Sequence, residues 1–134
     1  MSKSLIQTVN PSPQTVEVNG IISPGSVLRR YGCDCRLSGN AVEISGTGYY
    51  KITAAVSVAP TATGPVTVAA YINGVQAAGA VAYGAVSTAE NPTTLPIVTT
   101  IRRGCCCDNV DSLTLVLIAG AGTVQNVSLR VEKS

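Results

Sequence analysis

One segment of ten residues, at positions 49–58, constrains the fold of this chain more than any other feature, because every second side chain in it is apolar. The apolar set is Tyr50, Ile52, Ala54, Val56 and Val58. A period of two places these side chains on one face of a β-strand, whereas a helix would distribute them around its circumference. The segment therefore predicts a strand in a sheet that packs one face on a core.

Short β-branched runs of the same kind recur along the chain, separated by Gly, Pro, Asn and Ser. They predict strands at residues 5–9, 15–18, 26–30, 41–44, 49–58, 66–72, 79–87, 93–101, 113–118 and 124–131. Few windows carry a helical period, and a length of 134 residues suits one domain. The prediction is an all-β, single-domain jelly-roll sandwich of about ten antiparallel strands.

Three connections carry specific turn predictions. We expect residues 60–65 to join the strands at 49–58 and 66–72 as paired neighbours in one sheet. Asn73-Gly74 predicts a tight hairpin turn, because both residues tolerate a positive φ. The Ala-Gly-Ala-Gly segment at residues 119–122 is interpreted as a hairpin turn and not as a cofactor-binding loop.

The first 25 residues are rich in Pro, Ser and Gly. We interpret residues 1–25 as an N-terminal arm or edge strand, followed by a jelly-roll domain at residues 26–134. Such an arm either adds its strand to the sheet edge of a neighbouring subunit or closes the sheet of its own subunit. The sequence leaves both arrangements open.

Charged residues make up only 12% of the chain, about half of the roughly 25% usual in soluble proteins. A low charge density leaves much of the surface neutral and apolar, which is costly for a free monomer and normal for a protein within an assembly. We therefore expect the chain to assemble with copies of itself and with other structural subunits. A plain, modestly soluble monomer is the alternative.

The net charge is +2, and no basic run is longer than Arg29-Arg30 or Arg102-Arg103. Nucleic-acid-binding proteins usually carry a basic stripe interleaved with aromatic residues, so nucleic acid is not an expected partner. The two Arg pairs are candidates for contact with a negatively charged neighbouring subunit, and solvated surface is the alternative. Tyr31 and Tyr83 are candidate surface contacts for a sugar or another ligand.

Five cysteines fall into two groups, Cys33-Asp34-Cys35 and Cys105-Cys106-Cys107. Three interpretations remain open: reduced thiols that pack as small apolar residues, disulfides that form within or between subunits, and a soft-metal site. One intervening residue is a poor spacing for zinc, so no metal is expected. We do expect the two groups to approach each other in space.

The chain contains no histidine, which excludes Ser-His-Asp and Cys-His catalytic arrangements. Its seven carboxylates form no obvious facing pair of the kind that glycosidases use. No phosphate-binding glycine motif is present. The sequence therefore predicts no catalytic residue, no cofactor and no enzymatic activity.

Several motifs occur in an order that resembles one known family. The strand opening Gly48-Tyr49-Tyr50-Lys51-Ile52 follows residues 39–44, and the next strand ends in Asn73-Gly74. Residues 99–104 and a final strand at 127–131 complete the series. Over residues 14–132 the chain resembles the tumour-necrosis-factor-like and complement-globular-head jelly rolls, especially their bacterial and phage branch.

The resemblance implies a compact ten-stranded sandwich that commonly forms a homotrimer about a three-fold axis. Members of the bacterial and phage branch look like domains of virions, fibres and spore surfaces. This chain departs from the family pattern in two ways. Residues 105–109, Cys-Cys-Cys-Asp-Asn, stand where the family usually has a Gly-Asp turn, and few aromatic residues are present.

The leading functional hypothesis is a structural protein of a phage virion, as a capsid decoration or head-fibre subunit that forms homotrimers. One alternative is a spore-surface or appendage subunit joined by strand exchange and cysteine cross-links, and another is a glycan- or receptor-binding module. The first residues lack an apolar segment of secretory length, and no stretch approaches the roughly 20 apolar residues that span a bilayer. We therefore expect synthesis in a cytoplasm without a signal peptide, a final location on a virion or a spore or cell surface, and no membrane partner.

Overall fold

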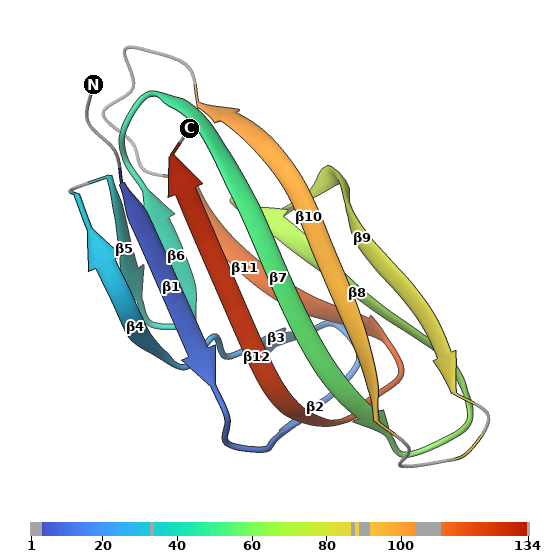
Figure 1. Cartoon of the computed structure of the whole chain (residues 1–134). Helices are drawn as coiled ribbons and strands as arrows, with labels where there is room; N and C mark the ends of the chain where they lie inside the picture. The colour runs from blue at the N-terminus through green and yellow to red at the C-terminus, as the bar shows by residue number, and fades with distance from the viewer. Residues whose placement is uncertain (1–3, 33, 87, 89–91, 104–110, 134) are drawn as a thin grey trace.

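The protein is described by a computed structural model that covers residues 4–32, 34–86, 88, 92–103 and 111–133. Within these residues every regular element is a β-strand, and the strands form two antiparallel sheets packed face to face (Figure 1). The all-β jelly-roll sandwich that the sequence predicts is confirmed.

The first sheet has five strands in series, and the short strand β2 (Gln14–Val16) pairs with the beginning of one of them, β12. Their order across the sheet is β10 (Thr93–Arg103), β7 (Gly48–Pro60), β12 (Gly122–Lys133), β1 (Leu5–Asn10) and β4 (Ser26–Tyr31). Figure 1 looks onto the outer face of this sheet.

The second sheet is built in the same way behind the first, with the short strand β3 (Gly20–Ile22) paired to β11. Its order is β5 (Cys35–Ser38), β6 (Ala41–Ile44), β11 (Asp111–Ala119), β8 (Gly64–Ile72) and β9 (Val75–Val86). Each of the ten predicted strands is present, with ends that differ by a few residues. The sequence missed β3 and β5, because strands of three and four residues carry too little alternation to be recognised.

The core lies between the sheets and consists almost entirely of aliphatic side chains. The alternating set on β7, Tyr50, Ile52, Ala54, Val56 and Val58, is at most 2% exposed. Facing it from β8 are Val66, Val68 and Ala70, all fully buried. The period-two prediction for these strands is confirmed.

The predicted pairing of β7 with β8 is wrong. β7 pairs with β10 and β12 in the first sheet, whereas β8 pairs with β9 and β11 in the second. Residues 61–63 therefore cross from one sheet to the other, and the apolar faces of the two strands meet across the core. Alternation reveals which face of a strand is apolar, but it does not reveal the strand's neighbour.

The predicted hairpin at residues 119–122 is also wrong, since β11 belongs to the second sheet and β12 to the first. Gly120 has a φ of 86° at this crossing, and a Cβ there would lie 2.9 Å from Val66 Cγ2. The hairpin at Asn73-Gly74 is confirmed. Both residues have positive φ, 54° and 82°, and Ile72 lies opposite Val75.

The N-terminal segment supplies an interior strand of its own sheet. β1 pairs with β12 on one side and with β4 on the other, so β4 occupies the edge (Figure 1). In this chain the segment thus closes its own subunit's sheet. The domain boundary at residue 25 and the exchange of this strand between subunits stay predictions.

Thr8 on β1 generates a stability prediction. It is 1% exposed, and its Oγ1 forms no hydrogen bond within the part of the chain that the structure describes. A buried hydroxyl without a partner costs about 1–3 kcal/mol. We expect Thr8→Val to raise the free energy of unfolding by about 1 kcal/mol and the Tm by about 4 °C, as measured by thermal and urea denaturation.

The matched control is Thr53→Val, because Thr53 is exposed on the outer face of the same sheet. It should leave the Tm nearly unchanged. A Thr8→Val variant that is less stable than the parent protein would show that the hydroxyl is satisfied in solution.

Candidate assembly surfaces

The predicted arginine and tyrosine contacts are divided between the two sheets. Arg29 and Tyr31 lie at the β4 edge of the first sheet and Arg102 at its β10 edge, and all three are exposed. Tyr83 belongs to β9 of the second sheet and is 78% exposed. Arg103 ends β10, and its side chain lies outside the described part of the structure.

Arg30 has a different role from Arg29. Its Nε donates a hydrogen bond to the backbone carbonyl of Cys35, at 2.8 Å. This bond joins the edge strand β4 of the first sheet to the edge strand β5 of the second. A charged side chain that covers a strand edge also discourages pairing with another chain.

Two cations that the sequence did not single out share the outer face of the first sheet with Arg29 and Arg102. Lys51 on β7 and Arg130 on β12 are both exposed, and Arg130 pairs with Glu132 on the same strand. Alternation in each strand indicates an outward direction for these residues. Only the strand register shows that these four cations lie on the same face, and no local motif reveals that register.

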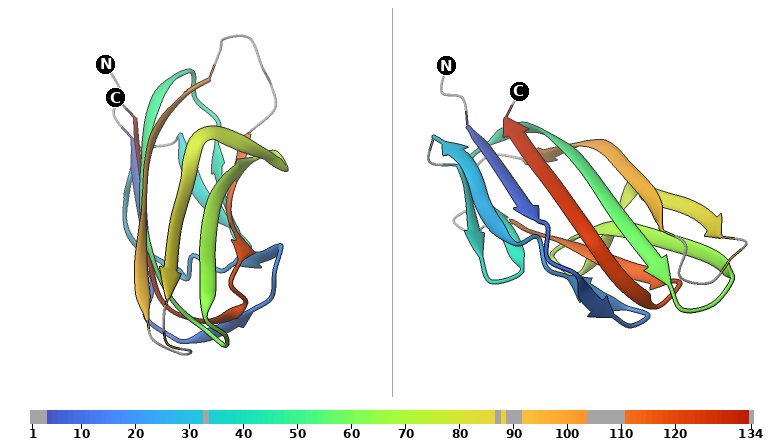
Figure 2. Two further views of the ribbon diagram at one scale, coloured as in Figure 1. Left: turned by 90° about the vertical axis from the view of Figure 1, so that its right-hand side faces the viewer. Right: turned by 60° about the horizontal axis from the view of Figure 1, so that its bottom comes forward.

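The strands β9 and β10 form one edge of the sandwich, opposite the edge formed by β4 and β5. We define its exposed apolar residues, Tyr83, Ala85, Pro96 and Val98, as the apolar edge. β9 and β10 lie next to each other there, as the left view of Figure 2 shows. All four residues are exposed, Val98 by 73%. A Cβ at Gly84 would lie 2.7 Å from Leu95 Cδ2, so the two strands pack closely.

A polar cluster at the pole near the chain termini ties the two sheets together. Asp34 Oδ2 accepts hydrogen bonds from Ser4 Oγ at 2.8 Å and from Lys133 Nζ at 3.2 Å. The backbone carbonyl of Asp34 accepts the Ser45 amide at 2.8 Å. Because Asp34 precedes β5, this one residue connects β1 and β12 of the first sheet to β5 and β6 of the second.

Gly46 makes room for this cluster. A Cβ at this position would lie 2.2 Å from Asp34 Oδ1 and 2.9 Å from the Tyr50 hydroxyl. The Tyr50 hydroxyl also donates to the Gly46 carbonyl at 2.7 Å. Any side chain at residue 46 must therefore displace either the carboxylate or the buried ring.

Cys35 belongs to the hydrophobic core and is 2% exposed. Burial, reinforced by the negative charge of Asp34, raises the pKa of its thiol to about 11. For Cys35 these observations agree with the interpretation of a reduced thiol that packs as a small apolar residue. Cys33, Cys105, Cys106 and Cys107 lie outside the described residues, so the approach of the two groups stays a prediction.

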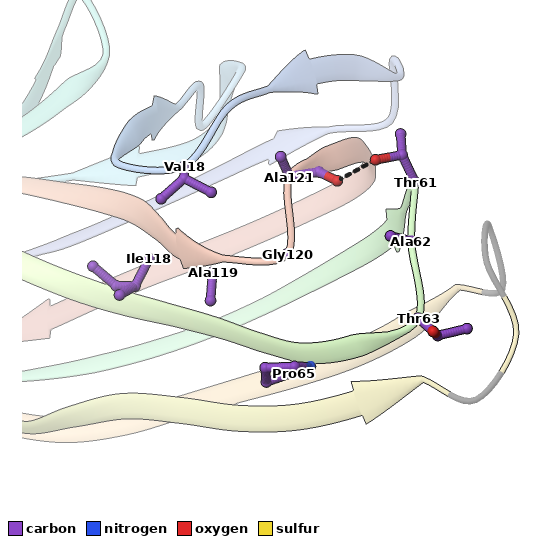
Figure 3. Close-up of a pocket in the computed structure, with 9 residues that line it drawn as sticks. All are labelled: Val18, Thr61, Ala62, Thr63, Pro65, Ile118, Ala119, Gly120 and Ala121. Carbon is purple, nitrogen blue, oxygen red and sulfur yellow. Dashed lines mark hydrogen bonds between the residues drawn. The ribbon is translucent and has the colours of Figure 1, made fainter.

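The pole opposite the termini holds an open groove of about 410 Å³, shown in Figure 3. Its lining consists of Val18, Thr61, Ala62, Thr63, Pro65, Ile118, Ala119, Gly120 and Ala121. Thr61 Oγ1 donates to the Ala121 carbonyl at 3.1 Å, which links the two connections that cross between the sheets. None of the described residues that line the groove is charged.

Among the described residues, no three Cys, Asp or Glu side chains gather in a way that could hold a metal ion. Within the same part of the chain, no helix has the length and apolarity needed to cross a membrane.

The burial of Cys35 predicts its chemistry. With a pKa of about 11, only about one thiol in a thousand is ionised at pH 8. We expect iodoacetamide to leave Cys35 unmodified in the folded protein and to alkylate it after denaturation, as read by peptide mass spectrometry. Alkylation of Cys35 under native conditions would contradict the buried position.

The space at Gly46 predicts a loss of stability on substitution. Gly46→Ala should lower the free energy of unfolding by about 1–3 kcal/mol, because the added methyl group overlaps Asp34. Ser38→Ala, at an exposed end of β5, is the control and should be nearly neutral. If the overlap is the cause, Gly46→Ala added to Asp34→Ala should cost much less than it costs alone.

Solved structures with the same fold include murine APRIL, a phage vertex protein and a complement globular domain, whereas no protein-family model and no curated protein sequence matches the chain. Murine APRIL aligns with a TM-score of 0.70 and 14% identity over 99% of this chain and 100% of its own. Vertex protein P5 of phage PRD1 aligns with a TM-score of 0.67 and 13% identity over 97% and 96%.

The globular domain of zebrafish complement 1qA aligns with a TM-score of 0.68 and 8% identity, over 94% of both chains. Each alignment spans nearly the whole of both chains, at identities that carry information about fold alone. The expected resemblance to tumour-necrosis-factor-like and complement-globular-head domains is therefore confirmed at the level of fold, and the chain is a jelly roll of that type.

Proposed function

We propose that this chain is a non-enzymatic structural subunit that forms homotrimers on the surface of a phage particle, as a capsid decoration or head-fibre protein. The observation that carries the proposal is the apolar edge. Its four side chains are exposed and uncharged in one subunit, and covering them removes apolar surface from water without desolvating a charge.

A complementary surface is available on the first sheet. The half of its outer face nearest the groove carries small uncharged side chains, Val9, Ala55, Ser57, Asn126 and Ser128, placed side by side by the strand register. A patch of small, neutral side chains lets the edge of a neighbouring copy approach closely. The two surfaces share no residue, and they adjoin where Pro96 lies opposite Ala55.

An edge that docks on a different surface of the next copy makes a head-to-tail contact. Such contacts close into a ring when the rotation between copies permits it, and otherwise extend into a filament. The three-fold ring is favoured here by the resemblance to domains that commonly form trimers. A trimer places three identical outer surfaces around one axis.

The position on a phage particle is supported by the likeness to a PRD1 vertex protein across almost the entire length of both chains. The same fold is found in murine APRIL and in a complement globular domain, so this part of the proposal depends on locating the protein. Mass spectrometry of particles purified from a lysate of cells that carry the gene should identify the chain as a stoichiometric component. Its absence from such particles would refute the assignment to a virion.

The trimer is tested by light scattering coupled to size-exclusion chromatography. We expect the mass of three chains for the parent protein, and the mass of one chain for a Tyr83→Lys/Val98→Lys variant, because the new charges would be buried at the interface. Val75→Lys is the matched control, since Val75 is 70% exposed and lies outside the apolar edge. A parent protein that elutes as a monomer at high concentration would overturn the proposal.

A further inference from the structure

Among the described residues, the outer face of the first sheet carries a row of cations that the outer face of the second sheet lacks. Arg29, Lys51, Arg102 and Arg130 are all exposed and come from four different strands. They are four of the seven lysines and arginines whose side chains the structure describes. The other three, Arg30, Arg36 and Lys133, are held by Cys35, Glu43 and Asp34.

The strand register fixes the geometry of this row, which we call the basic stripe (Arg29, Arg130, Lys51 and Arg102). Arg29 and Arg130 both lie opposite Gln7, one on each side of β1. Lys51 lies opposite Glu132, two residues beyond Arg130. Arg102 lies opposite Tyr49, two residues before Lys51.

With strands about 4.8 Å apart and a rise of about 3.3 Å per residue, successive Cα atoms of the stripe are about 8–10 Å apart. The stripe crosses the sheet diagonally from β4 to β10 over about 25 Å. Among the described residues on the outer side of these strands, Glu132 alone is acidic, and it pairs with Arg130. The face therefore keeps a net positive charge along a line.

Exposed aromatic rings accompany the stripe. Tyr31 is 52% exposed and adjoins Arg29 on the outer side of β4, while Tyr49 is 55% exposed and lies opposite Arg102. A tyrosine ring offers an apolar face with a hydroxyl at its tip, which suits contact with a sugar ring. The surface thus combines spaced positive charges with two such rings.

We propose that the basic stripe binds a linear acidic polysaccharide whose charges are widely spaced, such as one with a carboxylate on every second sugar. The spacing of the cations decides against nucleic acid as the preferred partner. A DNA strand carries one phosphate per about 3.4 Å, so cations whose Cα atoms are about 8–10 Å apart would leave most phosphates unpaired. This inference does not depend on the trimer.

Calorimetric titration of the full chain with hyaluronan oligosaccharides at low ionic strength tests the inference. We expect binding that weakens as salt is added, because exposed charges are screened. An Arg29→Gln/Lys51→Gln variant should bind about tenfold more weakly, which corresponds to two exposed ion pairs. Glu132→Gln should bind more tightly than the parent protein, a gain that misfolding cannot produce.

The matched control is Arg36→Gln, which removes a cation with 66% side-chain exposure from the second sheet. It should bind as the parent protein does, and neutral dextran should not bind. The inference would be overturned if Arg36→Gln lost as much affinity as the double variant, or if Glu132→Gln failed to strengthen binding. Tighter binding of single-stranded DNA at the same ionic strength would also overturn it.

Light scattering on the same samples separates this inference from the proposed function. Trimers without polysaccharide binding would refute the stripe as a binding site and leave the trimer intact. Monomers that bind the polysaccharide would refute the trimer and leave the stripe intact.

Discussion

The burial of aliphatic side chains between two sheets is the interaction on which the rest of this structure depends. The facing sets on β7 and β8 are almost completely excluded from water, and β11 and β12 contribute Leu113, Leu115, Leu117 and Leu129. Burying one such side chain stabilises a fold by about 1.5–3 kcal/mol, more than any single surface interaction in this chain can supply. Because the core contains few aromatic residues, many small aliphatic side chains fill the space between the sheets.

Polar interactions close the sandwich at its margins. Asp34 joins the two sheets at the terminal pole, and Arg30 joins their edges at β4 and β5. These interactions are partly exposed, so their contribution to stability is modest, and their effect is to set how the ends of the sheets meet. At the other pole the Thr61–Ala121 hydrogen bonds do the same for the two connections that cross between the sheets.

The two outer faces give the molecule its asymmetry. The first sheet has the basic stripe on one half and neutral side chains on the other, and the apolar edge lies along β9 and β10. The proposed self-association and the proposed binding of an anionic polymer therefore involve different residues. A subunit can take part in an assembly and still present its cations on the half-face nearer the termini.

The sequence alone determined ten of the twelve strands in the described residues, the apolar faces of β7 and β8, and the Asn73-Gly74 hairpin, because alternation and turn chemistry act over a few residues. The neighbours of each strand were decided only by the tertiary structure, since β7 and β8 are equally able to pair or to face each other across a core. The same holds for the basic stripe, whose members are separated by up to 101 positions, from Arg29 to Arg130. Local patterns specify which way a side chain points, whereas long-range register determines which side chains meet.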